Sequence, residues 1–305
     1  MLNTIKDGNV VKIEGVLSEI NLKYGSYAKN GKTNKTVTGN IKVRVDTQIN
    51  GEDTTLEIPV YLFANELKND GAKNPAFESI ERVMNEYVSI AASNYDVADR
   101  VRISRADIRM NEYYGQNGQL VSFPRINATF VTKIKKEDCN PEATFTAVFM
   151  VGEKTKEVDK DGIETGRLKI VGVLPQYGER VDVVPFYASN PGVVDAVSSY
   201  WNVDDTVKAT GRLNFSSKTE TILQEVDFGE PTKINRTISV SDLIITGGSS
   251  TPLDGDFALN PEEVRAALVA RKARLDELKN KPSTKGTSGA APAQAPVNKY
   301  RDLGF

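Results

Sequence analysis

The chain has 305 residues, a formal net charge of -2, 39 % hydrophobic residues, one cysteine and no histidine. This length and apolar content allow two domains of ordinary size, each with a packed core. A single cysteine excludes an internal disulfide, and the lack of histidine removes the commonest zinc ligand and the commonest general base. We therefore expect no catalytic residues, no bound metal and no cofactor, so the chain is not predicted to be an enzyme.

The sequence also lacks the signals of membrane insertion or export. No apolar run approaches the roughly 18 to 20 residues of a membrane-spanning helix, and the first residues lack the basic and apolar succession of a signal peptide. We expect a soluble protein of the cytoplasm. Its charge is uneven, with 19 basic and 16 acidic residues in 1–136 but 11 and 18 in 137–250. A polyanion is therefore expected to bind residues 1–136.

Two passages of the sequence repeat the same succession of residues. Gly39–Val45, Glu57–Tyr61 and Tyr95–Arg102 correspond to Gly166–Val171, Val183–Tyr187 and Trp201–Lys208. The spacing from glycine to proline is 20 residues in the first passage and 19 in the second. A repeated supersecondary unit explains this agreement, so the chain is predicted to be a tandem.

The elements of the first unit follow in chain order. A strand from Val10 to Ile20 contains Gly15, and a glycine inside a strand often allows a barrel strand to bend. Asn50 and Gly51 are suited to a tight hairpin turn, because both central residues of such a turn take positive φ. The other predicted elements are a polar loop (Tyr24–Val37), hairpin strands (Asn40–Gln48, Thr54–Phe63), a helix (Pro75–Val88), a strand (Asp99–Met110), a turn (Tyr113–Gly118) and a last strand (Gln119–Lys135).

The second unit repeats this plan with a shorter helix. Its predicted strands are Thr144–Glu157, Gly166–Leu174, Arg180–Ala188, Thr206–Asn214 and Thr237–Thr246, with a short segment at Pro191–Tyr200 and an irregular loop before the last strand. A linker at Gly247–Pro252 precedes a helix from Pro261 to Asn280, which Asn260 caps. Residues 282–298 are too poor in large apolar groups to fold.

Three strands, a helix and two strands are typical of a five-stranded Greek-key barrel of the OB-fold type. The predicted fold is mainly β, with two OB-fold barrels in tandem, a C-terminal helix and a disordered tail. The predicted divisions are residues 1–136 for the first, basic barrel, 137–250 for the second, 251–281 for linker and helix, and 282–305 for the tail.

In this order of elements and in its tail ending on an aromatic residue, the whole chain resembles tandem-OB-fold single-stranded DNA-binding proteins of bacteriophage type. The resemblance implies binding and protection of single-stranded DNA in replication, recombination and repair, in the host cytoplasm. Related bacterial proteins dock replication and recombination partners through an acidic tail tip that ends in Phe. The corresponding residues here are Asp302, Leu303 and Phe305, with Arg301 and a single Asp in place of the acidic cluster.

The residues themselves favour the same function. A sequence-tolerant binder of single strands needs a basic groove and flat side chains on which bases stack. OB folds bind across their second and third strands, between the loops that follow strands one and four. The candidate nucleic-acid-binding residues are Tyr24, Tyr27, Lys29, Lys32, Lys35, Lys42, Arg44, Tyr61, Arg102, Tyr113, Tyr114, Phe123, Arg125, Lys169 and Tyr177.

Several of these residues have a second interpretation. The three lysines at 29, 32 and 35 also fit a solvated loop, and Tyr61 and Phe63 also fit a barrel core. Tyr95 and Trp201, at equivalent positions of the two units, fit structural plugs better than base platforms. The helix from Pro261 either packs on the second barrel or binds a partner. For the whole chain, the alternatives are a structural module of a phage particle and an RNA-binding protein.

Overall fold

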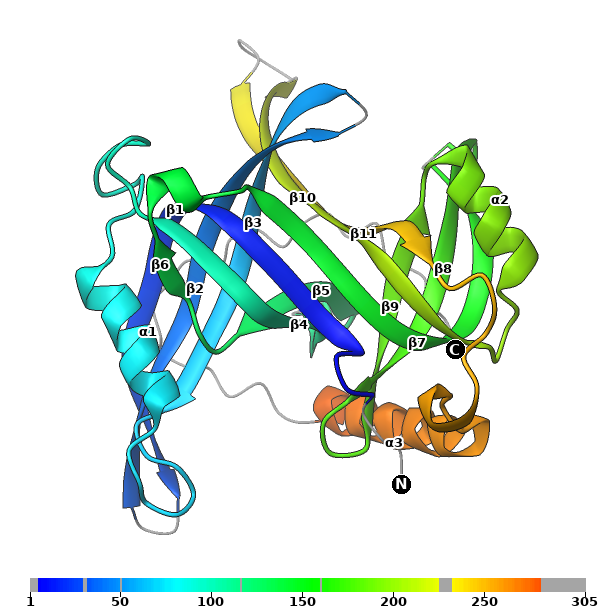
Figure 1. The fold of residues 1–305 in the computed structure, drawn as a ribbon, viewed down its shortest axis with the longest axis horizontal. Coiled ribbons are helices and arrows are strands. Elements are labelled where there is room, and N and C mark those ends of the chain that lie inside the picture. Colours follow the sequence, from blue (N-terminus) through cyan, green and yellow to red (C-terminus); the bar gives the residue numbers. More distant parts are fainter. Residues whose placement is uncertain are drawn as a thin grey trace.

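Eleven strands form one continuous sheet in the computed structural model, which describes residues 5–29, 32–49, 51–115, 117–159, 161–224 and 232–280. At positions 29, 32, 217–224 and 232–239 only the backbone is described. The strands pair into two closed sets, which we call the first ring and the second ring. One helix lies beside each ring, and a third helix lies near both (Figure 1). The predictions of a mainly β fold and of a C-terminal helix are confirmed.

The first ring contains β1 to β5. Its strands are β1 (Asn9–Lys29), β2 (Lys32–Ile49), β3 (Glu52–Asn65), β4 (Arg100–Tyr114) and β5 (Leu120–Ala128). β1 pairs with β2 and with β4, β2 pairs with β3, β5 pairs with β4, and the ring closes through a short parallel pairing of β3 with β5. A three-residue strand, β6 (Thr132–Ile134), adds to the end of β4.

The second ring repeats this order of pairing. Its strands are β7 (Glu142–Val158), β8 (Glu164–Gln176), β9 (Arg180–Ala188), β10 (Thr206–Gln224) and β11 (Thr232–Gly248). β7 pairs with β8 and with β10, and the ring closes through parallel pairing of β9 with β11. The start of β1 also pairs with the start of β7, so the two rings share one sheet.

Alternation of apolar and polar residues fixes the register of the strands, because successive side chains point to opposite faces. Along β3, Ile58, Val60 and Leu62 are fully buried and the residues between them are not. Gly15 allows β1 to pass close to β2, since a Cβ at this position would lie 2.2 Å from the carbonyl oxygen of Arg44. The glycine predicted to permit a bend therefore permits a close backbone approach.

Each helix covers one part of the rings. α1 (Pro75–Glu86) and α2 (Pro191–Tyr200) each begin with an asparagine cap followed by proline. α1 buries Phe77, Ile80 and Val83 against the strands, and α2 buries Val197. α3 (Pro261–Asn280) has the predicted bounds and packs Val264 and Ala267 on the second ring. The described residues also form two short 3-10 turns, Lys136–Asp138 and Gly255–Phe257. None of the described helices is both long and apolar enough to cross a membrane.

Two predicted loops are wrong, because the strands continue through them. Residues 22–29 of β1 pair with residues 32–39 of β2 as a two-stranded ribbon, and residues 213–224 of β10 pair likewise with 232–243 of β11. The sequences of residues 23–29 and 32–36 are mostly polar, so the apolar alternation that marks a half-buried strand is missing there. The predicted last strand of the first unit is also wrong in its extent, since β5 ends at Ala128.

Candidate nucleic-acid interface

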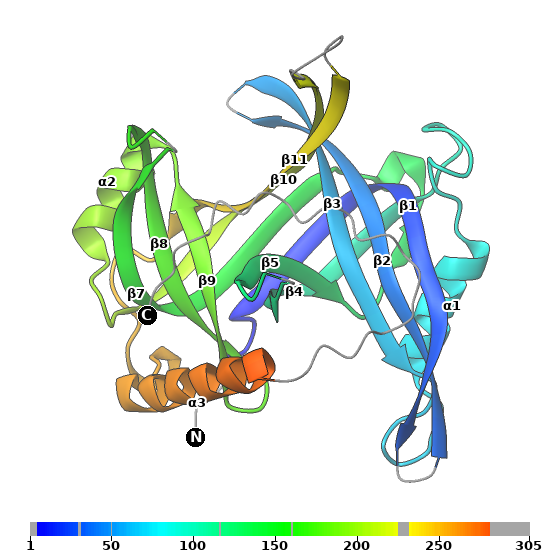
Figure 2. The same ribbon diagram turned by 180° about the vertical axis from the view of Figure 1, so that it is seen from behind.

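One continuous surface of the first ring is formed by β2, β3, β5 and β4. It consists of the side chains that point away from the core, every second residue along each strand. Opposite residues of paired strands share a face, and the register places Arg44 beside Glu57, Asn40 beside Tyr61, and Arg109 beside Arg125. Figure 2 shows β2 and β3 side by side, with β5 next to β3. We call this surface the outer face. It includes Lys42, Arg44, Tyr61, Phe63, Arg109, Tyr113, Phe123 and Arg125.

At the centre of the outer face, an arginine stacks on the aromatic side chain of a tyrosine. The guanidinium carbon of Arg125 lies 4.3 Å from the centroid of the Tyr61 ring, and the Tyr61 hydroxyl is 2.8 Å from the Thr38 hydroxyl. Phe63, two residues further along β3, is 48 % exposed. The core interpretation of Tyr61 and Phe63 is therefore wrong: both faces of β3 carry large apolar side chains, and the sequence pattern does not say which face is inside.

The end of the β4–β5 hairpin adds two more aromatic side chains to this surface. Phe123 is half-buried and Tyr113 is 42 % exposed. The strand register places both side chains on the outer face. Tyr114 is on the opposite side of β4, which it shares with Glu112. The two adjacent tyrosines are thus divided between two surfaces.

Most basic side chains of the outer face have a carboxylate partner. Lys42 Nζ lies 2.5 Å from Glu19 Oε2, Arg44 Nε lies 2.9 Å from Asp46 Oδ1, and Arg109 pairs with Asp107. Arg125 has no ion pair within the part of the chain that the structure describes. Exposed ion pairs contribute only about 0 to 1 kcal/mol, so a phosphate group can displace these carboxylates at little cost.

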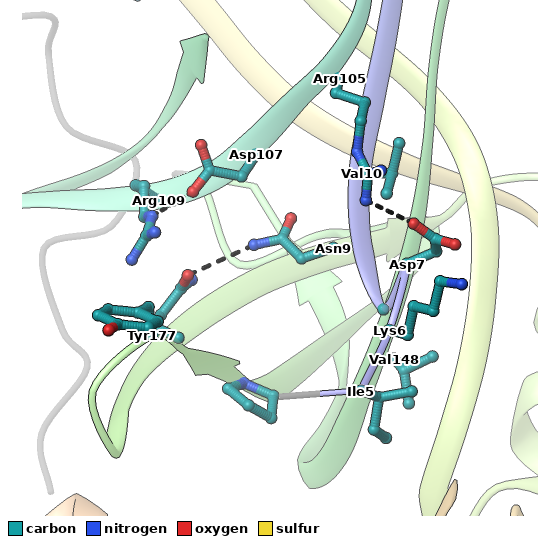
Figure 3. A pocket seen from close by; sticks show the side chains of 13 residues that line it. Ile5, Lys6, Asp7, Asn9, Val10, Arg105, Asp107, Arg109, Val148 and Tyr177 are labelled. Atoms are coloured by element: carbon teal, nitrogen blue, oxygen red, sulfur yellow. Dashed lines mark hydrogen bonds and ion pairs between the residues drawn. The ribbon is translucent and has the colours of Figure 1, made fainter. Parts of the chain in front are cut away.

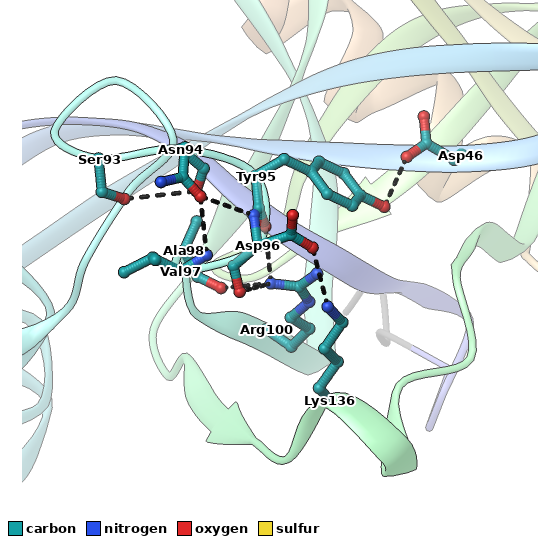
Figure 4. A network of polar contacts seen from close by, with 9 residues as sticks. All are labelled: Asp46, Ser93, Asn94, Tyr95, Asp96, Val97, Ala98, Arg100 and Lys136. Atoms are coloured by element: carbon teal, nitrogen blue, oxygen red, sulfur yellow. Dashed lines mark hydrogen bonds and ion pairs between the residues drawn. The ribbon is translucent and has the colours of Figure 1, made fainter.

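Tyr95 extends the surface near the end of β2, where it contacts Asp46 (Figure 4). Its hydroxyl donates to Asp46 Oδ2 at 3.0 Å, and the guanidinium carbon of Arg44 lies 5.0 Å from its ring centroid. Burial opposes ionisation of Asp46, but hydrogen bonds from Thr55, Arg44 and Tyr95 outweigh it and lower the pKa of this carboxyl. Burial, together with the hydrogen bond to Asp46, raises the pKa of Tyr95.

The two residues predicted to be plugs differ in exposure. Trp201 is 2 % exposed, packs edge-on against Phe149 and donates its indole N–H to the carbonyl of Ser249. Tyr95 is 39 % exposed. The plug interpretation therefore describes Trp201 but not Tyr95, whose contact with Arg44 no sequence pattern indicated.

The β1–β2 ribbon separates its candidate residues onto two faces. Tyr24 stacks on Phe77 of α1 with ring centroids 6.4 Å apart, and Lys35 Nζ lies 4.7 Å from the Tyr24 centroid. The register of β1 with β2 places the Tyr27 side chain on the same side as the outer face, and it is 40 % exposed. The side chains of Lys29 and Lys32 lie outside the described part of the chain.

Arg102 is away from the other candidates, where β4 pairs with β1 and β6. Its Nε lies 2.5 Å from Glu14 Oε2, and the backbone N–H of Asn140 donates to Glu14 Oε1 at 2.6 Å. Hydrogen bonding from Arg102 is the largest cause of the lowered pKa of Glu14.

In the second ring the corresponding surface is apolar and largely covered. Val173 and Val181 pack under α3, and Tyr187, which is opposite Lys169, is 3 % exposed beneath the guanidinium of Arg167. Tyr177 differs from these residues, since it is 86 % exposed at the β8–β9 turn. Of the two candidates in the second ring, Tyr177 is therefore open to solvent, whereas Lys169 lies beside the buried Tyr187.

The outer face has no metal-binding character. No group of three or more His, Cys, Asp or Glu residues suited to a metal ion occurs among the described residues. Chemically, the surface offers exposed aromatic rings, an arginine held flat on one of them, and cations that can exchange partners. These are the groups that bind an anionic chain carrying planar rings.

The fold and this surface define a mainly β protein with an exposed aromatic and basic face. The chain belongs to the YorF family, whose model matches residues 7–281. No curated protein matches the sequence significantly. Similar solved structures include the single-stranded DNA binding protein from Thermus aquaticus, in a deletion mutant (TM-score 0.49, 11 % identity, 83 % of this chain and 97 % of that chain) and in the wild type (TM-score 0.49, 11 % identity, 81 % and 94 %).

Proposed function

We propose that the protein binds single-stranded DNA without sequence preference along the outer face of the first ring. The observation that carries this proposal is the stack of Arg125 on Tyr61 with Phe63 exposed beside it. A single strand presents both phosphates and base faces, and each base stacked on an aromatic ring contributes about 1 to 3 kcal/mol. In this role the protein coats and protects single strands during DNA replication, recombination and repair.

The same proposal takes each ring to be an OB-fold barrel, so that the chain is a tandem of two. Support comes from the identical order of pairing in the two rings and from the helix that precedes the fourth strand of each. OB folds bind oligonucleotides across strands two and three. In the first ring these strands are β2 and β3, which carry Lys42, Arg44, Tyr61 and Phe63.

The remaining parts of the chain complete this functional proposal. The divisions are 1–136 for the main DNA site, 137–250 for the second barrel, 251–281 for linker and helix, and 282–305 for the tail. We infer that the tail recruits replication or recombination proteins through Asp302, Leu303 and Phe305, which lie outside the described residues. The protein is proposed to be of bacteriophage type, to act in the host cytoplasm and to have no enzymatic activity.

Fluorescence anisotropy of labelled oligo-dT tests this function. The full chain is expected to bind oligo-dT more tightly than a duplex of equal length, with an affinity that falls as salt rises. For single strands the slope of log affinity against log salt is about -0.7 per neutralised phosphate. No binding to any oligonucleotide at low salt would contradict the proposal and favour a structural module, whereas tighter binding to oligo-rU than to oligo-dT would favour an RNA-binding protein.

A further inference from the structure

A polar pocket of about 300 Å³ lies where the two rings meet. Four parts of the chain line it: residues 5–10 at and before the start of β1, the outer side of β4, Val148 of β7, and the end of β8 with the β8–β9 turn (Figure 3). Tyr177 is on that turn, and its ring lies across from Arg109 and Asp107. The pocket therefore joins a residue of the second ring to the outer face of the first.

Hydrogen bonds within the first ring, and one from the second ring to the first, hold this pocket in shape. Asn9 bonds with both backbone groups of Ile108, since its Nδ2 donates to the carbonyl at 2.9 Å and its Oδ1 accepts from the N–H at 2.9 Å. Gln176, next to Tyr177 in sequence and 3 % exposed, donates to the same carbonyl at 3.0 Å. Buried and satisfied polar contacts of this kind fix one geometry, so the β8–β9 turn keeps a constant position relative to β4.

The charges around the pocket favour an anion. Lys6, Arg105 and Arg109 supply three cations against the two carboxylates of Asp7 and Asp107. Arg105 pairs with Asp7 at 2.6 Å, and both of these side chains are more than half exposed. Arg109 pairs with Asp107, and these side chains are 32 % and 31 % exposed. Water therefore reaches both pairs and screens them. The pocket thus keeps an excess of positive charge beside an aromatic ring that is 86 % exposed.

The pocket is continuous with the outer face through Arg109. Arg109 is directly opposite Arg125 of β5, and Arg125 stacks on Tyr61 of β3. Neighbouring strands are about 4.8 Å apart, so a row of aromatic and arginine side chains crosses β3, β5 and β4 and ends at Tyr177.

We propose that single-stranded DNA bound on the outer face continues into this junction pocket, where a base stacks on Tyr177 and a phosphate contacts Arg109 and Lys6. This inference rests on the proposed function and assigns the second ring a specific part in it. With the junction pocket occupied, one protein molecule covers a longer stretch of DNA than the first ring alone can cover.

Substitution of Tyr177 combined with oligonucleotides of two lengths tests the junction site. Tyr177→Ala is expected to weaken binding of an oligo-dT of about 30 nucleotides roughly 5- to 100-fold, and to leave binding of one of about 8 nucleotides unchanged, since one OB fold covers about 4 to 16 nucleotides. Lys6→Ala is expected to weaken the long oligonucleotide alone and to make its salt dependence shallower. Matched controls are Tyr200→Ala, on an exposed tyrosine of α2, and Lys272→Ala, on an exposed lysine of α3.

The outcomes separate this inference from the proposed function. Normal binding of the long oligonucleotide by Tyr177→Ala and by Lys6→Ala would overturn the junction site and leave the outer face as the whole site. Equal losses for short and long oligonucleotides would also overturn it. Absence of binding by the wild-type chain would instead overturn the proposed function itself.

Discussion

At the scale of single residues, the outer face combines open rings with cations that already have partners. Lys42, Arg44 and Arg109 each contact a carboxylate, whereas Arg125 contacts a ring. A guanidinium over an aromatic face is held by the ring quadrupole and keeps its charge available to a further anion. Arg125 is therefore the cation on this surface that loses least when a phosphate binds.

Substitutions of Arg125 and Phe63 are expected to have different effects. Arg125→Ala removes a phosphate contact, so oligo-dT binding weakens and the salt slope becomes shallower by about 0.7. Phe63→Ala removes a stacked base, so affinity falls roughly 5- to 100-fold while the salt slope is unchanged. Anisotropy titrations at several salt concentrations measure both quantities.

Phe130→Ala is the matched control for Phe63→Ala. Phe130 is 54 % exposed, and it lies beyond the end of β5. Its loss is expected to leave affinity unchanged. Equal effects of the two phenylalanine variants would contradict the assignment of Phe63 to the binding surface.

The sequence predicted some of these residues because their types suit the function, but it could not predict their neighbours. Phe123 and Arg125 were candidates on a predicted strand and Tyr113 in a predicted turn, and the strand register places all three side chains on the outer face. Phe63 was interpreted as core but is exposed, and Tyr24 is exposed as expected, although its stacking on Phe77 of α1 was not predicted. Which face of a strand is buried depends on tertiary packing, which a single strand pattern does not encode.

At the scale of elements, the strands that bury one face were predictable and the ribbons were not. β9 and α3 have the bounds that the sequence indicated, because apolar periodicity and an asparagine cap marked them. Residues 23–28 of β1 and 33–35 of β2 are held by their own pairing and are mostly exposed, so their composition is that of a loop. The β10–β11 ribbon likewise leaves the second ring, and β10 lies against β3 (Figures 1 and 2).

Glu14 ties three elements together. It is on β1, it receives hydrogen bonds from Arg102 of β4, and it accepts from the backbone N–H of Asn140, just before β7. Its side chain is 5 % exposed. Glu14→Gln is expected to destabilise the fold by about 1 to 3 kcal/mol, because the donors of Arg102 then face an amide in place of a carboxylate. Urea unfolding at neutral pH measures this change.

The effect of Glu14→Gln depends on pH in a defined direction. The pKa of Glu14 is lowered in the folded state, so its contribution is fully present above the unfolded value of about 4.3 and is lost as pH falls through the folded pKa. The difference in unfolding free energy between variant and wild type is therefore expected to shrink below about pH 4. A constant difference across this range would contradict the account, and Glu52→Gln, at the exposed first residue of β3, is the control.

At the scale of the whole molecule, the two rings share a plan but not a surface. The sequence repeat predicted the common plan, since the glycine and proline positions agree. Packing of the helix from Pro261 on the second unit was one of its two interpretations and is observed. No sequence pattern predicted that α3 also reaches β4, where Arg271 and Arg274 contact Glu112. That arrangement depends on contacts between distant segments. It leaves the first ring as the open surface, with the junction pocket at its border.

The central claim is that single-stranded DNA lies on the outer face of the first ring, and photocrosslinking tests it most directly. Oligo-dT substituted with photoreactive iodouracil is irradiated with the full chain, and the crosslinked peptides are mapped by mass spectrometry. Crosslinks are expected in the peptides that contain Tyr61 and Phe63 of β3 and Phe123 of β5, and excess unlabelled oligo-dT should suppress them. Crosslinks confined to the second ring or to α3, with none on β3 or β5, would contradict the claim.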